Sequence, residues 1–125
     1  AGLHVKGSYR FEDVPGMLSG IDAGLVPSVW WDNGPQTVME YLACGVPVIG
    51  AALGGIVDLV HDGENGLLFR GNDRFHLAST LARVCREPAL LATLRGGVTP
   101  PRSISEHATV MEAEYRALVA ARKHL

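Results

Sequence analysis

The sequence predicts an α/β fold in which a short parallel sheet is flanked by helices. Short apolar runs alternate with stretches of helical pattern, and the run at 46–49 shows no polar alternation. Strands that alternate with helices build parallel sheets covered on both faces, and strands buried in this way are continuously apolar. Ligands of such sheets bind beyond the carboxyl ends of the strands, so the loops that follow the strands are the candidate site.

The first half of the chain is predicted to hold three strands and two helices. The strands are expected at 3–6, 23–26 and 46–49, and the helices at 14–19 and 35–44. Asn33 or Gly34 can cap the second helix, Pro35 suits its first turn and Gly45 ends it. The strand at 23–26 is expected to be buried.

The second half is predicted to be helical after a turn at 62–66 and a strand at 67–69. Asn72 or Asp73 can cap a helix whose apolar face is expected to consist of Leu77, Leu81, Val84 and Cys85. A second short helix is expected to begin at Pro88 and to end at the glycines 96 and 97.

A final helix is predicted to begin at a capping box formed by Ser103 and Glu106. Its apolar stripe consists of Ile104, Ala108, Met111, Tyr115 and Leu118. The stripe fits two interpretations equally well, docking on a partner domain or packing on the chain's own sheet.

Length, composition and charge narrow the function classes. The chain has 125 residues, 47% of them hydrophobic and 19% charged, which fits one globular domain. A formal net charge of −2 argues against a nucleic acid or an anionic membrane as partner. The two cysteines, Cys44 and Cys85, form no paired motif and are expected to be small core residues in a reducing compartment.

Several catalytic motifs are absent from the sequence. It contains no Gly-x-Gly, no Gly-Lys-Ser/Thr, no His-Glu-x-x-His and no Gly-x-Ser-x-Gly, and its five histidines lack ligand spacing. These absences argue against a Rossmann oxidoreductase, a P-loop kinase, a zinc enzyme and a serine hydrolase.

The segment 27–40 carries two carboxylates eight residues apart, Asp32 in a loop and Glu40 inside the following helix. The start of that helix presents free N–H groups and the positive end of the helix dipole, which suits a phosphate. Glu40 can accept hydrogen bonds from a ribose diol, and Asp32 can accept them from sugar hydroxyls. Spacing alone favours the alternative, in which Asp32 is a cap-region acid and Glu40 a solvated helix residue.

The combined pattern resembles the retaining GT-B glycosyltransferases of family 4. Their motifs are Pro-Ser, Glu-x7-Glu, Ala-x-Gly-x-Pro-Val-Ile, Gly-Gly and Asp-Gly-x-x-Gly. The chain has Pro27-Ser28, acids at 32 and 40, the segment 43–49, Gly54-Gly55 and the turn 62–66 in the same order and spacing. One position departs from the pattern, because Asp32 stands where the family has Glu.

The resemblance implies roles for individual residues. Glu40 corresponds to the acid that binds the nucleotide ribose, and Asp32 to the acid that contacts the transferred sugar and supports departure of the diphosphate. The backbone that would face the diphosphate and sugar belongs to Gly34, Pro35, Gln36, Thr37 and Val38. The loop that would read the base edge consists of Gly7, Ser8, Tyr9 and Arg10. Nearby packing is an equally good interpretation for Tyr9 and Arg10.

Two further pairs of residues are open to two interpretations. Gly54 and Gly55 either let the backbone approach a donor or simply form a tight turn. Trp30 and Trp31 either line a cleft between domains or pack beneath their own loop, and the second fate is the commoner one.

The resemblance also implies the organisation of the whole protein. Residues 1–125 would form a single partial nucleotide-sugar-binding domain, the Rossmann-like second half of the GT-B C-terminal domain, with the N-terminal acceptor domain absent from the chain. The intact protein would be a cytoplasmic hexosyltransferase that uses a nucleotide sugar, with peripheral membrane association open, and would need no metal or other cofactor. The chain alone is expected to be inactive and to self-associate through uncovered apolar surface.

A non-catalytic α/β module, either a degenerate donor domain or an assembly unit, is the alternative. Asp32 favours it, as does the scarcity of bases, since Lys6 and Arg10 are the only two in residues 1–62. The retained Glu40, Gly34-Pro35 and Gly54-Gly55 argue against it.

Overall fold

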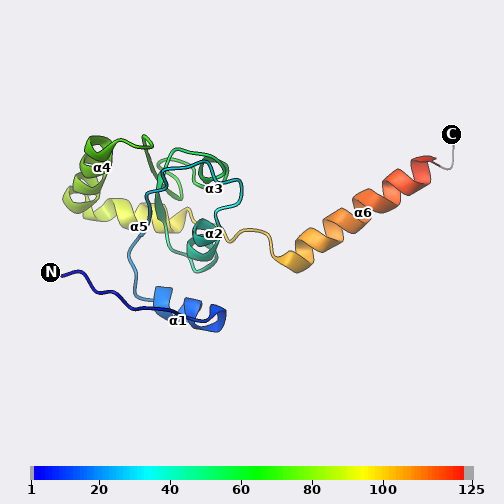
Figure 1. Ribbon diagram of the computed structural model, residues 1–125, viewed down its shortest axis with the longest axis horizontal. Coiled ribbons are helices and arrows are strands. Elements are labelled where there is room, and N and C mark those ends of the chain that lie inside the picture. Colours follow the sequence, from blue (N-terminus) through cyan, green and yellow to red (C-terminus); the bar gives the residue numbers. More distant parts are fainter. Residues whose placement is uncertain (1, 123–125) are drawn as a thin grey trace.

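The computed structural model describes residues 2–122, which contain a three-stranded parallel sheet flanked by helices (Figure 1). The elements in chain order are η1 (Phe11–Asp13), α1 (Val14–Leu18), β1 (Gly24–Val26), α2 (Gln36–Ala43), β2 (Val48–Ala51), α3 (Ile56–Leu59), β3 (Gly66–Phe69), α4 (Arg74–Arg86), α5 (Pro88–Gly96) and α6 (Ile104–Arg122). The strands lie in the order β1-β2-β3, and both neighbouring pairs are parallel. The predicted α/β class is therefore confirmed.

The sheet separates two apolar clusters, and the central strand β2 contributes to both. All four residues of β2 are buried. One cluster includes Val38 and Leu42 of α2 together with Val48, Ile56 and Val60. The other includes Ile49, Ala51 and Phe69, which pack against Leu77, Leu81 and Val84 of α4. Helices thus cover both faces of β2, as its uninterrupted apolar sequence predicts.

Strand β1 is buried less completely than predicted. Gly24 and Val26 are buried, but Leu25 between them is 42% exposed. Leu25 is in register with Ile49 and therefore stands on the sheet face that α4 covers. Helix α4 packs against β3, at the other end of the sheet, so it leaves the β1 end of this face open.

Two strand predictions differ from the structure. Residues 2–10 have no regular structure, and Leu3 is 93% exposed. An extended segment needs a neighbouring strand for its hydrogen bonds, and residues 3–6 pair with no strand in the described part of the chain. The strand predicted at 46–49 lies at Val48–Ala51 instead, beyond Pro47, which has no N–H to donate to a ladder.

Helix α2 ends as predicted but begins differently. Gly45 has φ +72, its N–H donates to Leu42 O at 3.0 Å, and the N–H of Val46 donates to Tyr41 O at 2.9 Å. These two bonds form a Schellman motif, which requires the left-handed backbone that glycine adopts readily. The N-cap is Pro35, and no side chain caps the helix, so the predicted cap at Asn33 or Gly34 is wrong.

The caps of two later helices are confirmed. The Asp73 side chain accepts from the N–H groups of Phe75 and His76 at the start of α4. Ser103 and Glu106 form the capping box of α6, since the Ser103 N–H donates to Glu106 Oε2 at 2.8 Å and the Glu106 N–H donates to Ser103 Oγ at 3.2 Å. Cys85 on α4 is exposed and Cys44 is half-buried, so the prediction of two core cysteines is wrong.

Helix α6 extends away from the rest of the molecule (Figure 1). None of its residues is buried, and Ile104, Tyr115 and Leu118 of its apolar stripe are each more than half exposed. Packing of this stripe on the chain's own sheet is therefore not observed. Among the described residues, no helix is long and apolar enough to cross a membrane.

Candidate functional site

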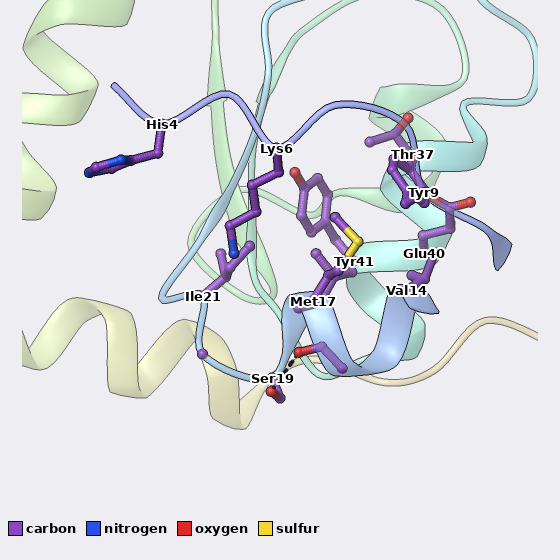
Figure 2. A pocket seen from close by; sticks show the side chains of 13 residues that line it. His4, Lys6, Tyr9, Val14, Met17, Ser19, Ile21, Thr37, Glu40 and Tyr41 are labelled. Atoms are coloured by element: carbon purple, nitrogen blue, oxygen red, sulfur yellow. Dashed lines mark hydrogen bonds between the residues drawn. The ribbon is translucent and has the colours of Figure 1, made fainter. Parts of the chain in front are cut away.

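A cavity of about 560 Å³ lies between the N-terminal segment, α1 and α2 (Figure 2). Three of the predicted site residues line it, namely Tyr9, Thr37 and Glu40. In Figure 2 these three side chains lie on one side of the Tyr41 ring, and the Lys6 side chain lies on the other side. The cavity therefore joins part of the predicted base-edge loop to part of the predicted α2 site.

Helix periodicity places the α2 side chains in this cavity. Glu40 and Tyr41 follow Thr37 by three and four residues, so all three lie on one helix face. The Tyr41 ring packs on β1, where a Cβ added to Gly24 would lie 2.6 Å from ring carbon Cε2. Burial raises the pKa of Tyr41 above its ordinary value, and the charges of Tyr9 and Glu40 raise it further. The Tyr41 hydroxyl is therefore uncharged at physiological pH, and the Tyr41 side chain lines the cavity beside Glu40.

Tyr41 is a cavity residue that the sequence prediction missed. Its spacing of four residues from Thr37 is the signal that could have found it. The apolar lining from Met17 and Ile21 was also missed. These residues precede β1, and no motif in the sequence links them to α2.

The predicted base-edge loop splits in the structure. Gly7 has the left-handed φ of +69, and Tyr9, 55% exposed, lines the cavity. Ser8 is exposed and does not line the cavity. Arg10 pairs with Asp13 of η1, with Nε 3.4 Å from Oδ2, and its N–H donates to the same carboxylate at 3.2 Å. Of the four loop residues, Tyr9 alone lines the cavity.

Asp32 lies outside this cavity, just before α2. It is half-buried, and its Oδ1 accepts the backbone N–H of Gly34 at 3.0 Å. The first two amides of α2, those of Gln36 and Thr37, have no intrahelical acceptor and no side-chain cap, whereas the Val38 N–H donates to Pro35 O at 3.0 Å. Four residues of helix, about 6 Å of rise, separate Gln36 at the start of α2 from Glu40. The two predicted acids therefore flank the N-terminal half of one short helix.

The turn between β2 and α3 packs against the loop that carries Asp32. The N–H of Gly55 donates to the Asp32 carbonyl oxygen at 2.6 Å, and Gly54 adopts φ +52. The tight turn expected of the glycine pair is therefore present, and it brings the pair close to Asp32 and its neighbours. Approach of this backbone to a donor stays a prediction. Trp30 and Trp31 in the same loop are 66% and 79% exposed, so their predicted packing beneath the loop is wrong.

Positive charge is sparse around these residues. Among the residues that the structure describes, Lys6 is the only lysine or arginine that lines the cavity, and Arg10 is engaged with Asp13. Within the part of the chain that the structure describes, no group of three or more His, Cys, Asp or Glu side chains could hold a metal ion.

The parallel sheet with flanking helices, and an acid pair around the helix between β1 and β2, define part of a GT-B glycosyltransferase fold. A family model described as "Glycosyl transferases group 1" matches residues 1–87, well over half of the chain. The chain therefore belongs to the group 1 glycosyltransferases, family GT4.

Individual relatives agree with this assignment. A D-inositol 3-phosphate glycosyltransferase of Salinispora arenicola is 37% identical over 103 residues, which are 78% of this chain and 23% of that protein. The solved sucrose-phosphate synthase of Thermosynechococcus elongatus is 34% identical, with a TM-score of 0.69 over 84% of this chain and 27% of its own.

A third relative adds the ligands that it binds. Anabaena HepE, solved with UDP, superposes with a TM-score of 0.73 at 21% identity, over 83% of this chain and 30% of its own, and was also solved with UDP-glucose. Across these three proteins, the chain spans between about a quarter and a third of the relative's length.

Proposed function

We propose that this chain is the donor-binding part of a retaining glycosyltransferase that moves a hexosyl group from a nucleotide sugar to an acceptor. One observation carries the proposal. In a chain of this family, α2 places Thr37 and Glu40 in the cavity that Tyr9 also lines, while Asp32 stands at the N-terminal end of the same helix. This spacing suits the nucleoside and sugar ends of one extended donor.

Each part of the proposed site matches one part of the donor. The Glu40 carboxylate accepts hydrogen bonds from the ribose diol, and Tyr9, the residue of the loop at 7–10 that lines the cavity, faces the base. The uncapped amides at the start of α2 and the helix dipole stabilise the diphosphate. Asp32 faces the transferred sugar. These groups position the donor and favour departure of the nucleoside diphosphate, and no protein nucleophile is assigned.

The small number of positive charges around the cavity supports a donor site that is completed by other regions of a larger protein. A diphosphate carries more negative charge than a single helix terminus neutralises, and charge-assisted bonds from Arg or Lys normally supply the rest. Within residues 2–122, Lys6 is the only such group that lines the cavity. We therefore assign the remaining bases and the acceptor site to regions outside this chain, and we expect no sugar transfer by the chain alone.

Exposed apolar surfaces of the chain also support its being one part of a larger protein. Leu25 on β1 and the apolar stripe of α6 are exposed here, and both suit contact with further protein. In the isolated chain the same surfaces favour self-association.

Nucleotide binding by the isolated chain tests the proposal. Amide NMR titrations with UDP, GDP and ADP at millimolar concentrations compare the wild type with Glu40→Ala. We expect shifts at 7–10 and 34–40 with one of the three nucleotides, and their loss in Glu40→Ala. Glu114→Ala is the control, because it makes the same change at a helical glutamate of α6, away from the cavity.

The same titration separates the two functions under consideration. A folded chain that responds to none of the three nucleotides contradicts a donor half-site that binds by itself. That result would favour the non-catalytic module, for which the short Asp32 side chain, bonded back to Gly34, is the supporting observation.

A further inference from the structure

The turn formed by Gly54 and Gly55 touches the main chain of Asp32 more closely than side chains would permit. A Cβ at Gly54 would lie 2.8 Å from the Asp32 nitrogen, and one at Gly55 would lie 2.9 Å from the Asn33 carbonyl oxygen. Real Cβ atoms essentially never come so close. The hydrogen bond from the Gly55 N–H to the Asp32 carbonyl depends on this approach.

Other glycines show that backbone conformation alone does not explain the pair. Gly63 has φ +79, yet a Cβ there would meet nothing within 4 Å. Gly55 is the opposite case, because its φ of −68 suits any residue while its surroundings do not. At position 55, glycine is therefore required only because the neighbouring loop lies too close for a side chain, and not because of the backbone conformation.

The contact fixes Asp32 from two sides. Its carbonyl is held by Gly55, which follows the fully buried strand β2, and its Oδ1 is held by the Gly34 N–H before α2. Pro35, the N-cap of α2, is buried and would lie 3.2 Å from a Cβ at Gly55. The glycine turn thus sets the position of the Asp32 carboxylate relative to the start of α2.

We propose that Gly54 and Gly55 are positioning residues for the sugar half of the donor site, which act by placing Asp32. This inference rests on the proposed function, in which Asp32 faces the sugar and Glu40 holds the ribose. Displacement of the turn therefore weakens recognition of the sugar while it leaves recognition of the nucleotide in place.

Two matched pairs of variants test the proposal. Gly54→Asn adds a side chain that tolerates the left-handed backbone, and Gly63→Asn makes the same change in open space. Gly55→Ala adds a Cβ against Asn33, and Gly96→Ala adds one at a helix end with nothing within 4 Å. Circular dichroism and urea unfolding establish which variants are folded.

The first readout needs no ligand. The amide signal of Gly34 reports on its hydrogen bond to the Asp32 carboxylate, and the two tryptophans, Trp30 and Trp31, directly precede Asp32. We expect both site variants to move the Gly34 amide signal away from its wild-type position and to change the tryptophan emission, while both controls match the wild type. Unchanged signals in folded site variants, or failure of both site variants to fold, would overturn the positioning role.

The second readout compares dissociation constants for UDP-glucose and UDP, the ligands of the HepE structures. If the wild type prefers UDP-glucose, we expect the site variants to reduce that preference by about tenfold, the effect of losing one hydrogen bond to a charged group, with UDP binding retained. An equal loss for both ligands overturns the proposal. Absence of binding in the wild type contradicts the proposed function, and the first readout still decides whether the turn places Asp32.

Discussion

The guanidinium of Arg95 donates a hydrogen bond of 2.8 Å to the carbonyl oxygen of Ile21. A second bond, from Nη1 to Gly45 O at 3.2 Å, makes Arg95 a bridge between the segment before β1 and the end of α2. The three residues are far apart in the sequence. Through Arg95, the segment before β1 is held against the end of α2, the helix that carries Thr37 and Glu40.

Loss of this bridge is expected to destabilise the protein. Arg95→Ala should reduce the free energy of unfolding by about 1–3 kcal/mol, because it removes charged hydrogen bonds to three carbonyl groups, those of Ile21, Asp22 and Gly45. Urea unfolding measures the change. Arg83→Ala is the control, since it breaks only an exposed ion pair with Glu87 and should cost at most about 1 kcal/mol. Equal losses in the two variants would contradict the bridging role.

A side chain at Gly24 should disturb the wall of the cavity. Gly24→Ala places a Cβ against the Tyr41 ring, and such overpacking costs about 1–3 kcal/mol. Gly16→Ala in α1 meets nothing within 4 Å and should be neutral or stabilise the protein by up to about 1 kcal/mol. Thermal or urea unfolding of the two variants compares them directly, and a destabilised Gly16→Ala with an unaffected Gly24→Ala would refute this account of the packing.

The cap of α4 should make stability depend on pH. Hydrogen bonding from the His76 N–H, aided by the Arg70 charge, lowers the pKa of Asp73 below its ordinary value in the folded state. The resulting stabilisation is present above the unfolded-state pKa and is lost as the pH falls through the folded-state pKa. We therefore expect the stability advantage of the wild type over Asp73→Asn to shrink below about pH 4.

Urea midpoints measured from neutral pH down to about pH 2 check this expectation. Asn retains a capping oxygen and removes only the charge, so other titrating groups cancel in the difference. A difference that stays constant, or grows as the solution becomes more acidic, would show that the Asp73 charge does not stabilise the cap.

The open end of the sheet should mediate self-association of the chain. Leu25 is 42% exposed on β1, an edge strand of the described sheet. Leu25→Lys should weaken association by roughly tenfold or more, because burial of one leucine contributes about 1.5–3 kcal/mol. Val57→Lys on α3 is matched in exposure, at 43%, and should have little effect. Sedimentation velocity over a range of concentrations measures both, and a monomeric wild type would rule out this surface.

The candidate site was predictable from sequence only in part. The helix face shared by Thr37 and Glu40 follows from their spacing, and the acids at 32 and 40 stand out by motif. The presence of Tyr9 in the same cavity follows from no local pattern, because a loop of exposed residues has no periodicity to place it. The strand predicted at 3–6 did not form because apolar character alone does not supply a pairing partner.

The sequence by itself determined the alternation of strands and helices, the glycine that ends α2 and the caps at Asp73 and Ser103. Each of these depends on hydrogen bonds or backbone conformations within a few residues of chain. The tertiary structure alone decided that Gly54 and Gly55 meet Asp32, that Arg95 meets Ile21, and that Leu25 stays exposed. Such contacts depend on the path of the whole chain, because close packing brings together segments that are distant in the sequence. The local sequence of one segment does not indicate which other segment it will contact.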